Sequence, residues 1–174
     1  MRVVAGELGG RRLHAPRGEE VRPTSDRVRE ALFSILADVD GLTALDLYCG
    51  TGALAIEAIS RGAAAATLVD TAIDAAERNV EQLGIADRCT LVRTDAVRFL
   101  ERDLATYDLV FCDPPYRLAA RRGPDLDRLL RPRLAEGARV IAESATAEPL
   151  ELSLPLLDAR RYGSTVVRIY GAAA

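Results

Sequence analysis

The chain has 174 residues, 49% of them hydrophobic and 28% charged, which supports one buried core but is too short for two full domains. No apolar run approaches the roughly 18 residues of a membrane span, and the amino terminus does not resemble a signal peptide. The three cysteines form no CxxC pair, which is typical of proteins in a reducing compartment. We therefore expect a cytoplasmic, single-domain protein that does not associate with membranes.

The net charge of −3 excludes a uniformly basic nucleic-acid-binding domain, but the charge is unevenly distributed. Residues 1–29 contain seven arginines and only four acidic residues. Because residues 1–24 are also rich in glycine and proline, we expect them to form a basic arm or hairpin. Residues 25–174 then form the body of the protein.

The first regular element is a helix expected at residues 25–37. It follows a Pro-Thr-Ser start signal, and its apolar side chains recur with the spacing of one buried helical stripe: Val28, Ala31, Leu32, Ile35 and Leu36.

Beyond residue 41, short apolar runs alternate with helical stretches. Strands are expected at residues 44–48, 66–69, 90–92, 109–112 and 139–142, and helices at 53–61, 72–83, 96–104 and 125–134. This alternation indicates a doubly wound α/β fold with a mostly parallel sheet. Residues 156–162 and 165–170 flank a Gly-Ser turn without a helix between them, which predicts an antiparallel hairpin at the carboxyl terminus.

A glycine-containing motif, residues 46–52, follows the first strand of the body and precedes a helix. Gly50 and Gly52 allow a tight turn and a close approach of the backbone to a nucleotide at the carboxyl edge of the sheet. The same spacing satisfies a dinucleotide fingerprint, so an NAD enzyme and a ligand-free turn are alternatives. Asp46 favours a cofactor with a cationic methionyl group, because a carboxylate would repel a pyrophosphate there. We therefore predict an S-adenosylmethionine site that also includes Tyr48.

Two further acidic residues end the next two strands. Asp70 comes about 20 residues after the glycines, where a carboxylate accepts hydrogen bonds from ribose hydroxyls. Asp95 is predicted to accept a bond from an adenine amine while the Ala96 amide donates to the ring. The alternative for Asp95 is a helix N-cap, and the two roles are compatible.

The Asp113-Pro114-Pro115-Tyr116 run follows an apolar strand and indicates the chemistry. Two prolines stiffen the turn, so that a carboxylate and a main-chain carbonyl are held side by side. Such acceptors engage the N–H bonds of an exocyclic base amine and localise its lone pair for attack on a methyl group. We predict that Asp113 and Pro114 are catalytic and that Tyr116 stacks on the base; a structural proline turn is the alternative.

These motifs, in this order, resemble those of class I S-adenosylmethionine methyltransferases that act on amino groups. Three surrounding segments, residues 22–24, 28–33 and 53–63, resemble the RsmD family of bacterial small-subunit ribosomal RNA (guanine-N2)-methyltransferases. This resemblance implies a seven-stranded sheet of order 3-2-1-4-5-7-6, S-adenosyl-L-methionine as cofactor, and small-subunit ribosomal RNA or the assembling subunit as partner. The family more usually has other residues at Tyr48, Cys49, Thr51 and Ala55.

RNA contacts are expected where arginines concentrate. We predict contacts from Arg22, Thr24, Arg27 and Arg29 near the first helix, and from Arg117 after the proline turn. The alternative for the first group is that this segment covers the sheet edge and its arginines form ion pairs with Glu19, Glu20, Asp26 and Glu30. No metal site is predicted, because the single histidine, His14, lies among Gly, Pro and Arg residues. We expect a monomer.

Other functions compatible with parts of the sequence are adenine-N6 methylation, covalent catalysis by Cys112 as in cytosine-C5 methyltransferases, and a catalytically silent RNA-binding module. The chain has no room for the target-recognition domain that adenine-N6 DNA methyltransferases carry. Cys112 lacks the Pro-Cys order of cytosine-C5 enzymes and is expected to point into the sheet. Asp113, where protein glutamine methyltransferases have asparagine, argues against that class.

Overall fold

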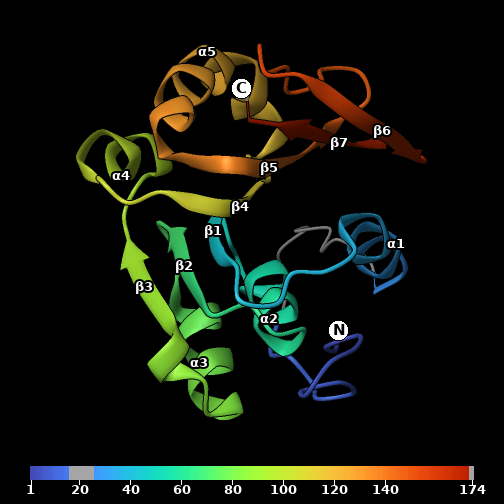
Figure 1. The fold of residues 1–174 in the computed structure, drawn as a ribbon, viewed down its shortest axis with the longest axis vertical. Helices are drawn as coiled ribbons and strands as arrows, with labels where there is room; N and C mark the ends of the chain where they lie inside the picture. Colours follow the sequence, from blue (N-terminus) through green and yellow to red (C-terminus); the bar gives the residue numbers. More distant parts are fainter. Residues whose placement is uncertain (16–25, 173–174) are drawn as a thin grey trace.

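A computed structural model describes residues 1–15 and 26–172 of the chain. Its elements, shown in Figure 1, are α1 (Asp26–Leu36), β1 (Thr43–Leu47), α2 (Ala53–Ser60), β2 (Ala65–Asp70), α3 (Asp74–Leu83), β3 (Cys89–Arg93), α4 (Ala96–Arg102), β4 (Tyr107–Cys112), α5 (Tyr116–Leu130), β5 (Leu134–Ala145), β6 (Leu156–Tyr162) and β7 (Thr165–Gly171), with short 3-10 turns at Ala86–Arg88 and Arg131–Arg133.

The strands form one seven-stranded sheet of order β3-β2-β1-β4-β5-β7-β6, as predicted. Strands β3, β2, β1, β4 and β5 pair in parallel, whereas β7 runs antiparallel to both β5 and β6. The parallel strands are joined by helices, and β6 and β7 by a two-residue turn. The carboxyl ends of β1 to β4 therefore meet at one edge of the sheet, where doubly wound folds bind nucleotides.

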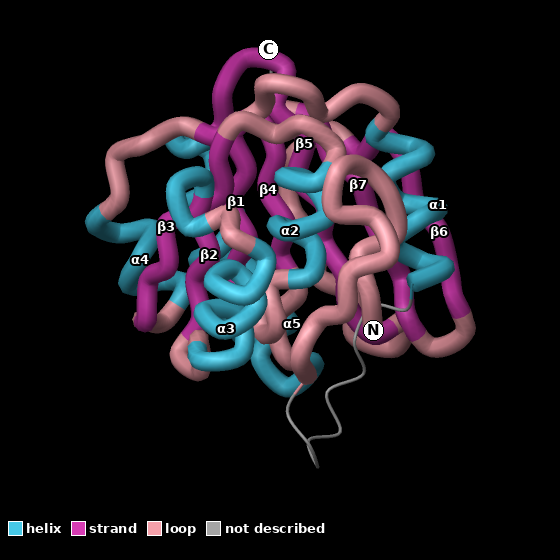
Figure 2. Tube along the Cα trace, turned by 90° about the horizontal axis from the view of Figure 1, so that it is seen from below, coloured by secondary structure: helices cyan, strands magenta, loops and turns pink. Residues whose placement is uncertain are grey.

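Helices cover both faces of the sheet, and side chains along β1 alternate between the two layers. Ala44 packs in the hydrophobic cluster with α1, α2 and α3, whereas Leu45 and Leu47 pack in the cluster with α4 and α5. Figure 2 shows α2 and α3 in front of the strands and α5 behind them. Both faces of the parallel strands are thus buried, which explains why these strands appear in the sequence as continuous apolar runs.

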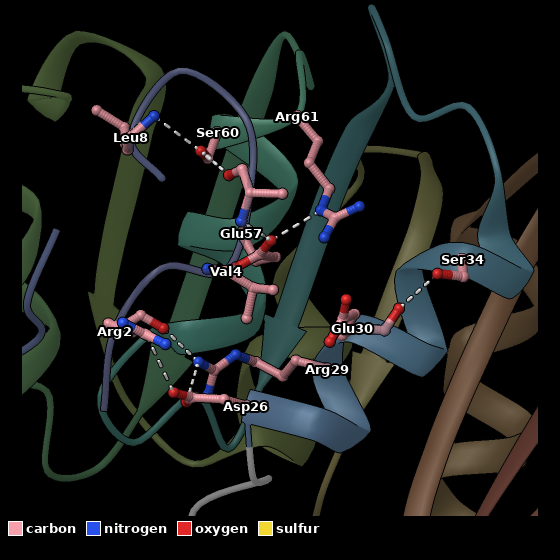
Figure 3. Close-up of polar contacts among 11 residues, drawn as sticks. Arg2, Val4, Leu8, Asp26, Arg29, Glu30, Ser34, Glu57, Ser60 and Arg61 are labelled. Carbon is pink, nitrogen blue, oxygen red and sulfur yellow. Dashed lines mark hydrogen bonds and ion pairs between the residues drawn. The ribbon is translucent and has the colours of Figure 1, made fainter. Parts of the chain in front are cut away.

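Residues 1–15 fold back on themselves, with an isolated antiparallel bridge between Arg2 and Arg12. This hairpin is docked on α2: the buried Glu57 carboxylate accepts hydrogen bonds from the backbone amides of Val4 and Ala5, at 2.7 and 3.0 Å (Figure 3). The Ser60 hydroxyl accepts from the Leu8 amide, also drawn in Figure 3. The hairpin is therefore part of the folded body over these residues.

The helix expected at residues 125–134 is wrong at both ends, because α5 spans Tyr116–Leu130. A Gly-Pro pair is a local helix breaker, and it suggested a loop before residue 125. In the structure Gly123 is buried, and a Cβ placed there would lie 3.4 Å from Leu150 Cδ1. The helix therefore continues through the Gly-Pro pair, with Gly123 packed against the segment after β5. None of the helices in residues 1–15 and 26–172 is long and apolar enough to span a membrane.

Candidate active site

The loop after β1 turns sharply over the end of β2. Tyr48 has a left-handed backbone conformation, with φ of 62°, and its amide donates to the Val69 carbonyl oxygen at 2.9 Å. Gly52, at φ of 75°, begins α2, and a Cβ there would lie 2.7 Å from Leu68 Cδ2. Strained backbone at a non-glycine residue is typical of functional sites. The predicted glycine loop is thus present, and Gly52 suits it because its backbone is left-handed and a Cβ there would require Leu68 to shift.

Asp70 ends β2 directly beside this loop. One of its carboxylate oxygens accepts from the Gly50 amide at 2.9 Å, and the other accepts from the Ala72 amide at 3.0 Å. The residue is partly exposed; Oδ1 also accepts from the Thr71 hydroxyl at 3.4 Å, and Oδ2 retains a second lone pair. Asp70 therefore fixes the loop and keeps acceptor capacity toward the carboxyl edge of the sheet.

Asp46 lies beneath the loop, with 2% of its surface exposed. Its carboxylate accepts from the Ala55 amide in the first turn of α2, at 3.1 Å. Burial raises the pKa of Asp46 to about 7; the bond from Ala55 opposes this shift and the nearby Asp70 adds to it. The carboxyl group therefore changes charge near neutral pH, and a cation beside it would favour the ionised form.

Asp95 begins α4, and its side chain caps the helix by accepting from the amides of Val97 and Arg98, at 3.1 and 3.3 Å. The predicted N-cap role is therefore confirmed. The other carboxylate oxygen accepts from Arg122 Nη2 on α5, at 3.4 Å. Nearby, the Tyr48 hydroxyl is buried with no hydrogen-bond partner among the described residues. Buried polar atoms of this kind commonly form their hydrogen bonds with a bound ligand or a water molecule.

Asp113 follows β4, and its amide lies 3.5 Å from the Leu47 carbonyl oxygen at the end of β1. Pro114 is buried and Pro115 is exposed. Loss of hydration raises the pKa of Asp113 well above its usual value, and the carboxyl groups of Glu143 and Asp46 raise it further. The proline turn thus lies next to the glycine loop, and the Asp113 carboxyl group lies near the carboxyl groups of Glu143 and Asp46.

Cys112, the residue before this turn, is buried in the cluster under α4 and α5. Burial raises the pKa of its thiol far above the usual value, and the charges of Asp113 and Asp46 act in the same direction. A thiol held protonated is a poor nucleophile. The covalent cysteine mechanism is therefore disfavoured by the environment of Cys112.

The residues predicted to contact RNA are not placed together. Arg27 is exposed on α1 and, with Arg2, Asp26 and Glu30, lines a cavity of about 400 Å³. Arg29 is wholly buried; its guanidinium donates to the Asp26 carboxylate at 2.8 Å and to the Arg2 carbonyl oxygen (Figure 3). Burial leaves Arg29 no surface for a phosphate, so its predicted RNA contact is withdrawn.

Four predicted residues fall outside what the structure describes. Arg22 and Thr24 lie outside residues 1–15 and 26–172, and for Tyr116 and Arg117 only the backbone at the start of α5 is described. The described residues contain no group of three or more His, Cys, Asp or Glu side chains able to hold a metal ion.

Glu143 is a candidate site residue that the sequence interpretation missed. It follows the predicted strand 139–142, and it is buried, with 9% of its surface exposed. The available signal was an acidic residue directly after an apolar strand, the same pattern that marks Asp70 and Asp113. In the structure β5 continues through Glu143 to Ala145, so this acid lies within a strand and not in a turn after it.

Comparisons with known proteins find a matching family model and related proteins. A family model described as "Conserved hypothetical protein 95" matches residues 1–171. Ribosomal RNA small subunit methyltransferase D of Escherichia coli K12 is 38% identical over 120 residues, which cover 67% of this chain and 61% of that protein. The putative rRNA methyltransferase YlbH of Bacillus subtilis is 37% identical over 124 residues, 67% of each chain.

A solved structure extends the similarity to the whole fold. The putative methyltransferase yhhF of Escherichia coli superposes with a TM-score of 0.86 at 34% identity, covering 100% of this chain and 98% of that one. The sequence alignment to the first curated relative, by contrast, spans less than two thirds of that relative's length.

Proposed function

Because the chain belongs to the family described as Conserved hypothetical protein 95, the RsmD family, we propose that it transfers a methyl group from S-adenosyl-L-methionine to the N2 amine of a guanine in small-subunit ribosomal RNA. The observation that carries this proposal is the Asp113-Pro114 turn at the end of β4, set against the glycine loop that follows β1. An amine acceptor and a nucleotide-binding loop are thereby adjacent at one edge of the sheet.

The residues around the glycine loop fit the proposed cofactor. Gly50 has open space on the side where a Cβ would project, and the Tyr48 hydroxyl is buried without a partner among the described residues. Asp70 has acceptor capacity for ribose hydroxyls, and Asp95 for an adenine amine. Asp46, with a pKa of about 7, suits the cationic methionyl end. When bound, the cofactor supplies an electrophilic methyl group.

Asp113 and the carbonyl of Pro114 would prepare the target amine. The lone pair of guanine N2 is delocalised into the ring, which makes the amine a poor nucleophile. When the carboxylate and the carbonyl accept its two N–H bonds, they localise that pair and hold the nitrogen in line with the methyl group. The desolvated setting of the Asp113 carboxyl strengthens these charge-assisted hydrogen bonds. Tyr116 is proposed to stack on the base.

The base must leave its stack to reach this turn, so the enzyme needs contacts to the RNA backbone. Helix α1 leads into β1 through a short loop, and its last residue, Leu36, accepts a bond from Arg139 near the beginning of the parallel part of β5. The helix therefore runs antiparallel to β1 and begins on the side of the sheet where the strands end. We propose phosphate contacts by Arg27, together with Arg22, Thr24 and Arg117.

A methyl-transfer assay with labelled S-adenosylmethionine tests this function. The protein is incubated with protein-free small-subunit ribosomal RNA, assembled small subunits or duplex DNA, and the nucleosides are identified by mass spectrometry. We expect N2-methylguanosine from one or both ribosomal substrates and none with Asp113→Ala. N6-methyladenosine would instead support the adenine alternative, and binding of RNA without methylation of any substrate would support the silent RNA-binding module.

A further inference from the structure

Strand register places a second carboxyl group beside Asp113. In the parallel β4–β5 pair, Cys112 lies opposite Ala142, so the next residues along the two strands are Asp113 and Glu143. Side chains alternate between the faces of a strand. Cys112 and Ala142 both pack in the cluster with α4 and α5, and Asp113 and Glu143 therefore share the opposite face.

This neighbour is buried and acidic. Glu143 is 9% exposed, and its partner on the other side, Val167 of β7, is apolar. Asp46 reaches the same region from β1, where it lies opposite Phe111, two residues before Asp113. Like charges in a desolvated site disfavour ionisation of both groups. The pKa of Asp113 is accordingly raised, first by loss of hydration, then by Glu143 and then by Asp46.

We propose that Glu143 is a positioning residue of the reaction: its carboxyl group, held beside Asp113 by the β4–β5 register, makes Asp113 the acceptor for the proton that the target amine releases. This inference rests on the proposed function. It goes beyond that function because it assigns a destination for the proton and a role to a buried residue on β5.

The reaction releases a proton, which an acceptor must take up. As the nitrogen–carbon bond forms, the bond between the methyl carbon and sulfur breaks, and its electron pair stays on sulfur. The nitrogen then carries a positive charge, which it loses when one N–H bond breaks and the proton passes to the Asp113 carboxylate. A general base works best when its pKa is close to the operating pH. An isolated aspartate, with a pKa of about 3.9, is a weak base at neutral pH.

The test is the pH dependence of turnover in Glu143→Gln, which keeps the shape of the side chain and removes its charge. Asp113 must be ionised to act, so activity falls as the pH drops through its pKa. Without Glu143 that pKa is lower, and we expect the acidic limb of the kcat profile to move about one pH unit toward acid. Because Asp113 is then a weaker base, kcat on the alkaline plateau should fall roughly threefold while KM for RNA and cofactor stays within about twofold.

Two companion variants separate this effect from a structural one. Glu143→Asp keeps the charge but withdraws it by one methylene, and we expect a smaller shift in the same direction. Glu148→Gln removes an exposed charge three residues after the strand and should leave the acidic limb unchanged. If Glu143→Gln is too unstable to assay, the pH profile of kcat in Glu143→Asp tests the proposal instead. A wild-type pH profile in that variant contradicts the proposal.

A measurement without substrate distinguishes this inference from the proposed function. Carbon-13 NMR of labelled aspartate carboxyl groups, with the Asp113 signal assigned by its loss in Asp113→Asn, follows the ionisation of Asp113 directly. We expect the midpoint to fall in Glu143→Gln. An unchanged midpoint or an unchanged acidic limb overturns the role of Glu143, whereas a wild-type protein that methylates no RNA overturns the proposed function.

Discussion

The carboxylate of Asp70, at the end of β2, holds the amide of Gly50 at 2.9 Å and so ties the glycine loop to the neighbouring strand. The same carboxylate accepts from the Ala72 amide at 3.0 Å. One side chain therefore shapes the loop and is proposed to bind the ribose of the cofactor. Both roles predict that removing this side chain weakens cofactor binding.

Asp70→Ala is expected to weaken S-adenosylmethionine binding at least about 10- to 100-fold, because the loss of even one charge-assisted hydrogen bond costs roughly 1.5 to 3 kcal/mol. Calorimetric titration measures this effect directly. Asp74→Ala is the matched control: it removes a nearby aspartate that pairs with Arg93 at the surface, and it should leave affinity unchanged. Wild-type affinity in Asp70→Ala would contradict the assignment of the cofactor site.

Asp46→Asn is expected to stabilise the cofactor-free protein more at pH 8 than at pH 5. The folded-state pKa of about 7 lies above the ordinary value of 3.8, so the folded protein holds this proton more tightly than the unfolded chain does. The stability of the wild type therefore falls as the pH rises from about 4 to 7, and asparagine avoids that loss. The difference in Tm between variant and wild type, measured across this range, should grow with pH. A difference that stays constant with pH would contradict the raised pKa of Asp46.

Glu57→Ala is expected to weaken the docking of the amino-terminal hairpin on α2 without changing the cofactor site. The substitution leaves the amides of Val4 and Ala5 without their acceptor and breaks the ion pair to Arg61 at 2.7 Å. The loss of a buried charged acceptor costs about 3 kcal/mol, which lowers Tm by roughly 6 to 12 °C in a domain of this size. Thermal unfolding measures this decrease in Tm. Below the Tm of the variant, its affinity for the cofactor should equal that of the wild type.

Alanine substitutions at Arg27 and Arg29, two residues apart on α1, are expected to have different effects. Arg27→Ala removes an exposed cation, so RNA affinity should fall and the slope of log affinity against log salt should lose about one unit, with Tm unchanged. Arg29→Ala removes a buried guanidinium bonded to Asp26 and Arg2, so stability should drop. Filter binding over a salt series and thermal unfolding separate the two; an Arg27 variant with full RNA affinity would remove α1 from the proposed RNA surface.

Much of the fold was predictable because the signals are local. Apolar runs alternating with amphipathic stretches predicted the strands and helices, and the family resemblance implied the strand order. Acidic residues at or just after strand ends marked Asp70, Asp95 and Asp113. Parallel strands in a doubly wound sheet end at one edge, so residues far apart in sequence become neighbours there without further information.

The errors arose where tertiary contacts override local preference. Gly123 and Pro124 normally interrupt a helix, yet α5 continues through them, with Gly123 buried against Leu150. Arg29 looked like one of several surface arginines, and only the docking of residues 1–15 on α1 and α2 explains its burial. The position of Glu143 beside Asp113 depends on the register between β4 and β5, which the sequence does not specify.

The central claim is that the Asp113 turn methylates guanine N2 in small-subunit ribosomal RNA. The most direct measurement is nucleoside mass spectrometry of that RNA from a strain lacking this gene, complemented with either the wild type or Asp113→Ala. Because Asp113 is proposed to contact the amine and not the cofactor, the purified variant should bind S-adenosylmethionine with near wild-type affinity. We predict that one N2-methylguanosine disappears on deletion, returns with the wild type and stays absent with the variant; an unchanged N2-methylguanosine content on deletion would contradict the account.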